Sequence, residues 1–186
     1  MSRFDFTPTP LSGLLLVERK ALGDARGYLQ RLWCQDEWQA VFGDRRIAQV
    51  NHTYTASAAT VRGLHFQHSP YAEAKYVSCL RGRVLDVAVD LRAGSPTFLQ
   101  WHAEELSAAN RRSLFIPEGF AHGFQTLEDD CEMLYVHSAP YVAEAEGGVN
   151  AMDPRLGIAW PLPMGEQSPR DQQFAFLDHS FTGVTP

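Results

Sequence analysis

Lysine is scarce in this sequence. Only Lys20 and Lys75 occur among the 16 basic residues, and the others are arginines. No dense basic block is present, and the formal net charge is −6. Because nucleic acids and anionic membrane surfaces attract clustered positive charge, neither is expected as a partner. In a chain that uses arginine almost everywhere else, each lysine is a candidate functional residue.

Cysteine is also scarce. The three cysteines are Cys34, Cys79 and Cys131, an odd number with no CxxC spacing. This argues against a disulfide framework and against a structural zinc site, and it fits reduced thiols in a cytosolic protein. Cys79 and Cys131 lie within apolar runs, so we expect buried, unreactive thiols there.

Long hydrophobic runs are absent near the N-terminus. Residues 14–17 form a short apolar run with prolines before it and charges after it, unlike a signal peptide or a membrane span. The chain is therefore expected in the cytoplasm. Its 186 residues, 45% hydrophobic and 20% charged, predict one soluble globular domain covering residues 1–186.

Short β-forming runs separated by turn residues recur along the chain. The clearest spans residues 83–91, where apolar Val84, Val87, Val89 and Leu91 accompany acidic residues. Further strands are expected at 14–18, 28–33, 47–53, 61–66, 75–80, 97–106, 113–116, 122–127 and 131–137. Many strands without alternating long helices predict an all-β sandwich or barrel.

One helix is expected at residues 36–42. Asp36 could cap its N-terminus, Trp38 and Phe42 supply an apolar face, and Gly43 could end it. From Glu144 onward Gly, Pro and Asp become dense, which predicts loops and short helical turns. These elements would flank the sheets.

Two histidines lie in segments that could carry chemistry. In residues 61–67, strand alternation would place Arg62, Leu64 and Phe66 on one face and Gly63, His65 and Gln67 on the other. His122 follows a tight Pro/Gly turn at residues 117–119. Two histidines on two strands of a small barrel indicate either a metal site or acid–base catalysis.

Several motifs together carry a family resemblance. The spacing Pro117-x-Gly119-x-x-His122 resembles the second motif of cupin barrels. This spacing, with Lys75 and the segments RGLHFQ (62–67), DVAVDLR (86–92), SPTF (95–98), LSAAN (106–110) and IPEGFAHGF (116–124), resembles the dTDP-4-dehydrorhamnose 3,5-epimerase family from about Leu14 to Asp171. The resemblance implies a cupin-type double-stranded β-helix, a jelly-roll barrel with a few short flanking helices.

The resemblance also implies a reaction. The family inverts C3 and C5 of dTDP-4-dehydro-6-deoxy-D-glucose to give dTDP-4-dehydro-L-rhamnose, for the synthesis of surface polysaccharide. The acidic C–H bonds beside the 4-keto group require a base, an acid on the opposite face and an enolate stabiliser. The alternatives are a C3-only epimerase, an isomerase of a related nucleotide-linked 4-keto sugar, and a non-catalytic cupin that binds a nucleotide sugar.

No cofactor or metal is expected. The family needs none, and His65 and His68 would point to opposite faces of a strand instead of converging on one ion. The resemblance implies that His65 is the general base and that Asp171 orients it. It further implies that Lys75 stabilises charge on the C4 oxygen and that Tyr135 is the proton donor on the opposite face.

Further residues match the family's substrate contacts. Arg26 and Arg62 match contacts to the two phosphates, His122 a contact to the sugar, and Tyr141 an aromatic that stacks on the thymine. The remaining matches are polar contacts to the nucleotide or at the rim of the site: Gln49, Asn51, Glu146 and Arg170. Arg31 departs from the family, which usually has Glu there, and it leaves the identity of the nucleotide base open. The family forms homodimers through N-terminal strand exchange and sheet packing, so a homodimer is implied.

Other polar residues are expected to be structural. Asp86 and Asp90 share one strand face and would lie at a sheet edge or in solvent. Structural or surface positions are likewise expected for the remaining histidines: His52, His68, His102, His137 and His179. The tryptophans are expected to pack in the core or at an interface.

Overall fold

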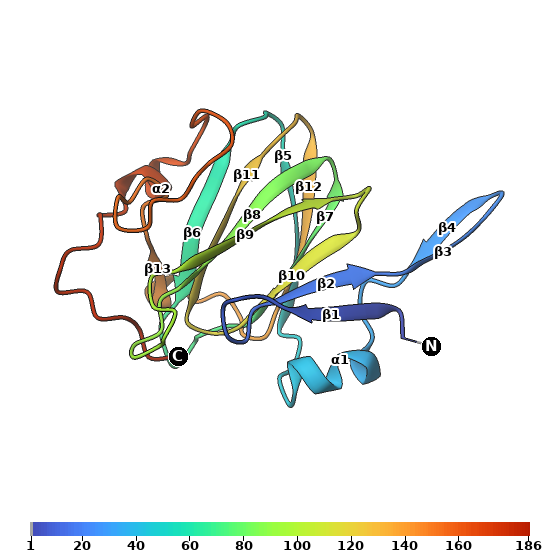
Figure 1. Ribbon diagram of the computed structural model, residues 1–186, viewed down its shortest axis with the longest axis horizontal. Helices are drawn as coiled ribbons and strands as arrows, with labels where there is room; N and C mark the ends of the chain where they lie inside the picture. The colour runs from blue at the N-terminus through green and yellow to red at the C-terminus, as the bar shows by residue number, and fades with distance from the viewer. Residues whose placement is uncertain (1) are drawn as a thin grey trace.

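Two antiparallel sheets dominate the computed structural model, which describes residues 2–186 (Figure 1). The first sheet has the order β1 (Phe4–Pro8), β2 (Leu15–Arg19), β10 (Arg112–Ile116), β7 (Lys75–Arg81), β12 (Cys131–His137) and β5 (Gln49–Thr55). The second has the order β13 (Glu146–Gly148), β6 (Val61–Gln67), β11 (Phe120–Thr126), β8 (Arg83–Asp90) and β9 (Trp101–Ser107).

Five further elements lie outside these sheets. The strands β3 (Ala21–Asp24) and β4 (Gly27–Gln30) form a separate hairpin that projects away from the sheets (Figure 1). The helices are α1 (Gln35–Phe42) and α2 (Pro169–Gln173), with a single 3₁₀ turn, η1, at Ala143–Ala145. Among the described residues, no helix is long and apolar enough to cross a membrane.

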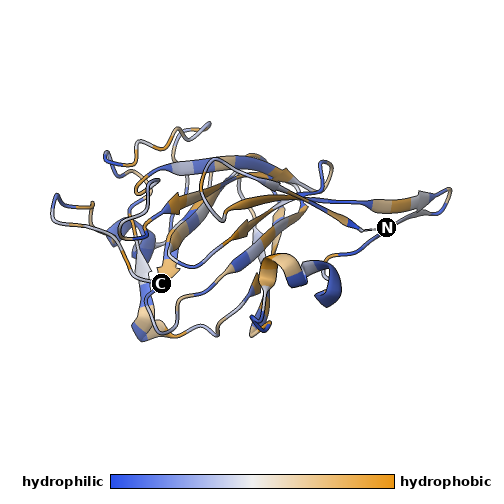
Figure 2. Cartoon of the chain, turned by 60° about the horizontal axis from the view of Figure 1, so that its bottom comes forward, coloured by the Kyte–Doolittle hydropathy of each residue, from blue (hydrophilic) through white to orange (hydrophobic). Residues whose placement is uncertain are grey.

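The main core lies between the two sheets. Val77 and Met133 of the first sheet pack with Val84, Ala88 and Phe124 of the second, and all five are essentially inaccessible to solvent. Figure 2 shows hydrophobic and hydrophilic residues interspersed along the strands. Burial of the hydrophobic residues between the sheets stabilises the stack of sheets.

The outer faces of both sheets are also covered. On the first sheet, Trp38 and Phe42 of α1 pack against Tyr76 and Phe115, and the Trp38 and Tyr76 ring centroids are 4.3 Å apart. On the second sheet, Leu156 and residues near the C-terminus pack against the strands, with Leu64, Val87, Val89, Val149 and Val184 in the same cluster. The C-terminal segment is therefore anchored beside the second sheet.

The all-β prediction is confirmed, and so are most predicted strands. The predicted strand at 28–33 ends at Gln30, and β9 begins only at Trp101, because the residues before it form a turn. Three strands were not predicted: β1, β3 and β13. All three are five residues or shorter and lie at a sheet edge or in the small hairpin.

The helix at 36–42 is confirmed, with a different start. Cys34 is its N-cap and makes no side-chain capping bond, so the predicted cap at Asp36 is wrong. Asp36 lies in the first turn, where its negative charge still interacts favourably with the helix dipole. Gly43 ends the helix as predicted, at φ 62°, and its N–H donates to the Gln39 carbonyl.

Candidate active site

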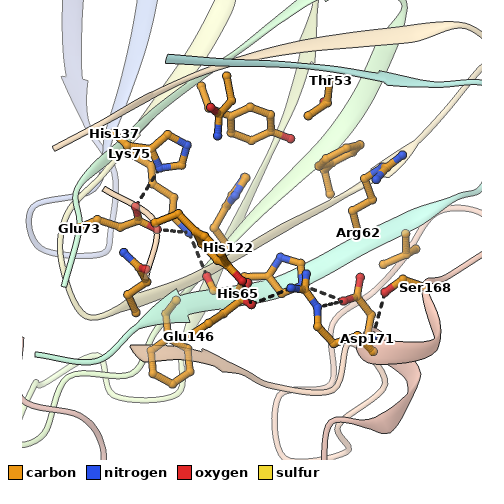
Figure 3. A pocket seen from close by; sticks show the side chains of 18 of the residues that line it. Thr53, Arg62, His65, Glu73, Lys75, His122, His137, Glu146, Ser168 and Asp171 are labelled. Carbon is orange, nitrogen blue, oxygen red and sulfur yellow. Dashed lines mark hydrogen bonds and ion pairs between the residues drawn. The ribbon is translucent and has the colours of Figure 1, made fainter. Parts of the chain in front are cut away.

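A cavity of about 590 Å³ is lined by strands of both sheets and by the segment that leads into α2 (Figure 3). It collects all but one of the predicted site residues, the exception being Arg26. Those that line it are Gln49, Asn51, Arg62, His65, Lys75, His122, Tyr135, Tyr141, Glu146, Arg170 and Asp171. The cavity thus joins residues from distant parts of the chain.

A bulge in β6 decides which side chains face this cavity. His122 of β11 is opposite His65, whereas Phe124 is opposite Arg62, so three steps along β6 match two along β11. His122 and Phe124 share a strand face, and Arg62 therefore faces the cavity together with His65. The prediction that Arg62 and His65 lie on opposite faces is wrong, because it assumed an unbroken alternation.

His65 and Asp171 form a close pair. The His65 Nε2 and Asp171 Oδ1 atoms are 2.8 Å apart, and the other carboxylate oxygen accepts a hydrogen bond from the Gly63 N–H at 3.1 Å. Ser168 caps α2 by accepting a hydrogen bond from the Asp171 N–H, which stabilises the first turn of this short helix. Burial would raise the pKa of Asp171, but the bonds from His65 and Gly63 outweigh it and lower the pKa to about 2.

The ionised Asp171 fixes the tautomer of a neutral His65. Its carboxylate can only accept, so Nε2 carries the hydrogen and Nδ1 is left with the basic lone pair. Arg170 Nη2 lies 3.1 Å from the same Nε2, but it can only donate. Arg170 is therefore better described as an ionic neighbour of Asp171, with Nε 3.5 Å from Oδ1.

Lys75 and Tyr135 come from the opposite sheet, on the neighbouring strands β7 and β12. Lys75 is 6% exposed, and its Nζ donates to the His65 carbonyl at 3.2 Å. Desolvation, and secondly the negative charge of Asp86, raise the pKa of Tyr135 well above its usual range. The phenol therefore keeps its proton at neutral pH, as a proton donor requires.

Asp86 and Asp90 are buried, and the prediction that they lie at an edge or in solvent is wrong. Their strand β8 lies between β11 and β9, so both of its edges are covered. Asp86 Oδ2 is 2.9 Å from His122 Nε2 behind the cavity wall. Asp90 is held by Arg92, Ser95 and Thr97 and organises the turn before β9.

Sequence reasoning missed Glu73 and His137. Both line the cavity, and their side chains are only 7% and 11% exposed. Strand alternation offered the signal, because Glu73 precedes Lys75 by two residues and His137 follows Tyr135 by two. The sequence does not show that Glu73 and His137 are partners, because they lie on distant segments of the chain.

The rim of the cavity is polar and partly exposed. Arg62 donates to Thr55 Oγ1 at 3.0 Å, and among residues 2–186 no carboxylate forms an ion pair with it. Tyr141 donates to Glu146, which also pairs with Arg170 at 2.6 Å. Arg62, which has no carboxylate partner among the described residues, and the exposed Tyr141 ring line the same cavity, and together they can accept an anionic ligand with a planar ring.

Two arginines from the N-terminal region lie elsewhere. Arg26 is at the tip of the β3–β4 hairpin, 90% exposed in its side chain and paired with Asp24 at 2.5 Å. It does not line the cavity of its own chain. Arg31 also lies outside the cavity and pairs with Glu37 of α1, which gives the charge at this position a structural partner.

Comparison with known proteins identifies the family of this chain. The family model described as dTDP-4-dehydrorhamnose 3,5-epimerase matches residues 8–179. Curated relatives with that name include one from Sinorhizobium fredii, 42% identical over 84% of this chain and 80% of its own. Another, from Salmonella typhimurium, is 41% identical over 92% of this chain and 94% of its own. A dTDP-4-dehydrorhamnose 3-epimerase from Streptomyces niveus is 37% identical over 91% of this chain and 82% of its own.

Solved structures agree with these sequence matches. The 3,5-epimerase of Legionella pneumophila in complex with dTDP-4-keto-L-rhamnose has a TM-score of 0.90 and 34% identity, covering 98% of this chain and 99% of that one. A 4-keto-6-deoxy sugar epimerase from Streptomyces spheroides has a TM-score of 0.89 and 36% identity, covering 94% and 88%. These matches confirm the family resemblance and the fold that it implied. This chain belongs to the dTDP-4-dehydrorhamnose 3,5-epimerase family.

Proposed function

We propose that this protein is an epimerase that inverts C3 and C5 of dTDP-4-dehydro-6-deoxy-D-glucose and yields dTDP-4-dehydro-L-rhamnose. One observation carries the proposal: the hydrogen-bonded His65 and Asp171 side chains lie in the same cavity as Lys75 and Tyr135 of the opposite sheet. Family membership and the ligand named for the Legionella structure support the same substrate.

His65 begins the reaction as the general base. With Nε2–H held by Asp171, the lone pair of Nδ1 takes the proton from C3 or C5 of the sugar. The C–H electrons form a carbon–carbon double bond, and those of the C4 carbonyl move onto its oxygen to give an enolate. The buried ammonium of Lys75 then stabilises the negative oxygen more strongly than the neutral ketone.

Tyr135 completes each inversion. Its phenol delivers a proton to the same carbon from the opposite face, so configuration inverts while no atom is gained overall. The raised pKa of Tyr135 keeps the phenol protonated until the enolate, a strong base, draws the proton away. Proton exchange with water returns His65 and Tyr135 to their starting states.

The polar rim would bind the nucleotide. Arg62 and Arg170 supply guanidinium groups for the diphosphate, and exposed Tyr141 offers a ring on which thymine can stack. Gln49 and Asn51 add polar contacts on β5, and His122 and Glu146 complete the wall and rim. This local positive charge allows an anion to bind although the whole chain carries −6.

A homodimer is part of this proposal. The β3–β4 hairpin projects from the sheets and exposes Leu22, Tyr28 and Leu29, which favours burial against another chain (Figure 1). In such a dimer Arg26, which lies outside its own cavity, would reach the partner's substrate. We further propose a cytoplasmic location, where nucleotide sugars are available for polysaccharide synthesis.

Incubation with the substrate in deuterated water tests the reaction. Incorporation of deuterium at both C3 and C5 is expected, and it should be lost in His65→Ala while binding of dTDP persists. Label at neither carbon would reject the epimerase. Label at C3 alone would instead favour a C3-only epimerase, the activity named for the Streptomyces niveus relative.

A further inference from the structure

A buried carboxylate connects Lys75 to a histidine that the proposed reaction does not use. Glu73 Oε1 is 3.2 Å from Lys75 Nζ, and Glu73 Oε2 is 2.9 Å from His137 Nδ1 (Figure 3). The side chains of Lys75, Glu73 and His137 are 8%, 7% and 11% exposed. The three groups thus form one closely packed cluster in the cavity wall, which we call the Glu73 cluster.

The sheet fixes the geometry of this cluster. Lys75 and His137 are opposite each other in the β7–β12 pairing, and Glu73 lies in the segment that enters β7. The His137 ring stacks on that of Tyr135, with centroids 6.0 Å apart and planes at 24°. Glu73 therefore contacts the cation directly and supports the proton donor through His137.

The charge state of Glu73 agrees with this arrangement. Burial would raise the pKa of Glu73, but the hydrogen bond from His137 and the charge of Lys75 outweigh it and leave the pKa below its usual range. The carboxylate is thus ionised and can accept from both neighbours at once, one through each oxygen.

Counting hydrogen-bond donors shows what this does for Lys75. An ammonium group has three N–H donors. Within the described chain, the Lys75 ammonium forms an ion pair with the Glu73 carboxylate at 3.2 Å and donates a hydrogen bond to the His65 carbonyl at 3.2 Å. The third is left for a ligand in the cavity that Lys75 lines.

We propose that Glu73 is a positioning residue, which fixes the Lys75 ammonium so that one N–H is directed at the C4 oxygen of the substrate. The inference rests on the proposed function, because that function supplies the oxygen. It assigns Glu73 no contact with substrate and no proton transfer. Loss of the carboxylate should therefore lower turnover more than it weakens binding.

The small number of lysines allows a direct measurement. With lysine side chains labelled with ¹⁵N, only Lys20 and Lys75 can give ammonium signals, and Lys20→Arg assigns them. Lys75 is buried and hydrogen-bonded, so its ammonium protons should exchange slowly and be detected without substrate. In Glu73→Gln this signal should broaden beyond detection. An unchanged signal in that variant would overturn the proposal.

Kinetics provide the second readout. Glu73→Gln should lower kcat by about 10-fold or more and change KM by less than about threefold. The matched control is Glu118→Gln. It removes a carboxylate that is paired with Arg45 at 2.6 Å and does not line the cavity, so it should change neither kcat nor the Lys75 signal. An unaltered kcat in Glu73→Gln, or an equal loss in both variants, would contradict positioning.

Two further results keep this inference separate from the proposed function. If the wild-type protein leaves the substrate unlabelled, the proposed function fails, while the ammonium signal still decides whether Glu73 holds Lys75. If Glu73→Gln does not fold, the wild-type spectrum decides instead. A Lys75 ammonium signal that exchanges as fast as that of Lys20 would overturn the proposal.

Discussion

The buried Asp86 carboxylate lies 2.9 Å from His122 Nε2 through one oxygen, while its other oxygen has no hydrogen-bond partner in the described chain. A buried acceptor left unpaired costs free energy, and a buried negative charge costs more. Asp86 is therefore a destabilising element held in place by the surrounding sheet.

Replacement of Asp86 by Asn should show this cost through its pH dependence. Burial raises the pKa of Asp86 above its ordinary 3.8, so the native state binds a proton more tightly than the unfolded state does. Wild-type stability from this group consequently falls as the pH rises above 3.8. Urea unfolding at pH 4 and pH 7 should show that the free energy of unfolding of Asp86→Asn, relative to that of the wild type, is higher at pH 7 than at pH 4. A constant difference would contradict the assignment.

Asp171→Asn should have the opposite pH dependence. The pKa of Asp171 is lowered from 3.8 to about 2, so its contribution is present above 3.8 and lost as the pH falls toward 2. At pH 7 the variant should lose about 2 kcal/mol of unfolding free energy, and the loss should shrink at pH 2–3. Its kcat should fall about 100-fold or more, because His65 loses the group that fixes its tautomer.

Gly63→Ala tests the bulge that brings Arg62 and His65 to one face. Gly63 has φ 120°, and an added Cβ would lie 2.6 Å from Gly123 Cα and 2.7 Å from the His122 carbonyl oxygen, both backbone atoms. We expect a loss of about 2 kcal/mol or more in chemical denaturation, together with loss of activity. Gly27→Ala is the control, because φ is 132° there and nothing lies within 4 Å. Equal effects in both would place the cost in backbone strain alone.

Co-expression of Arg26→Ala and His65→Ala chains tests the proposed dimer. If Arg26 serves the partner's cavity, a mixed dimer has one site with an intact His65 and an intact Arg26. Activity should recover to about a quarter of the wild-type level under random pairing. His65→Ala with Asp171→Asn should not recover, because both residues belong to one cavity. Failure of the first pair to recover would remove Arg26 from the partner's site.

The sequence was sufficient to predict most strands because alternation is a local property. It also predicted eleven of the residues that line the cavity, through motifs that resemble a family. What it missed depended on pairing between segments. The bulge at Gly63 turns the Arg62 side chain to the same face of β6 as His65. Asp86 is buried because β8 has a neighbouring strand on both edges. Glu73 acquires its partner His137 only when β7 and β12 pair.

The pair of His65 and Asp171 joins residues 106 positions apart, and the carboxylate comes from the short helix near the C-terminus. During synthesis every strand of both sheets precedes that helix. A chain interrupted before Asp171 could thus contain the complete sheets and still lack an oriented base. Synthesis of the chain through Asp171 is therefore a condition for an oriented base, and it comes after all the strands of both sheets.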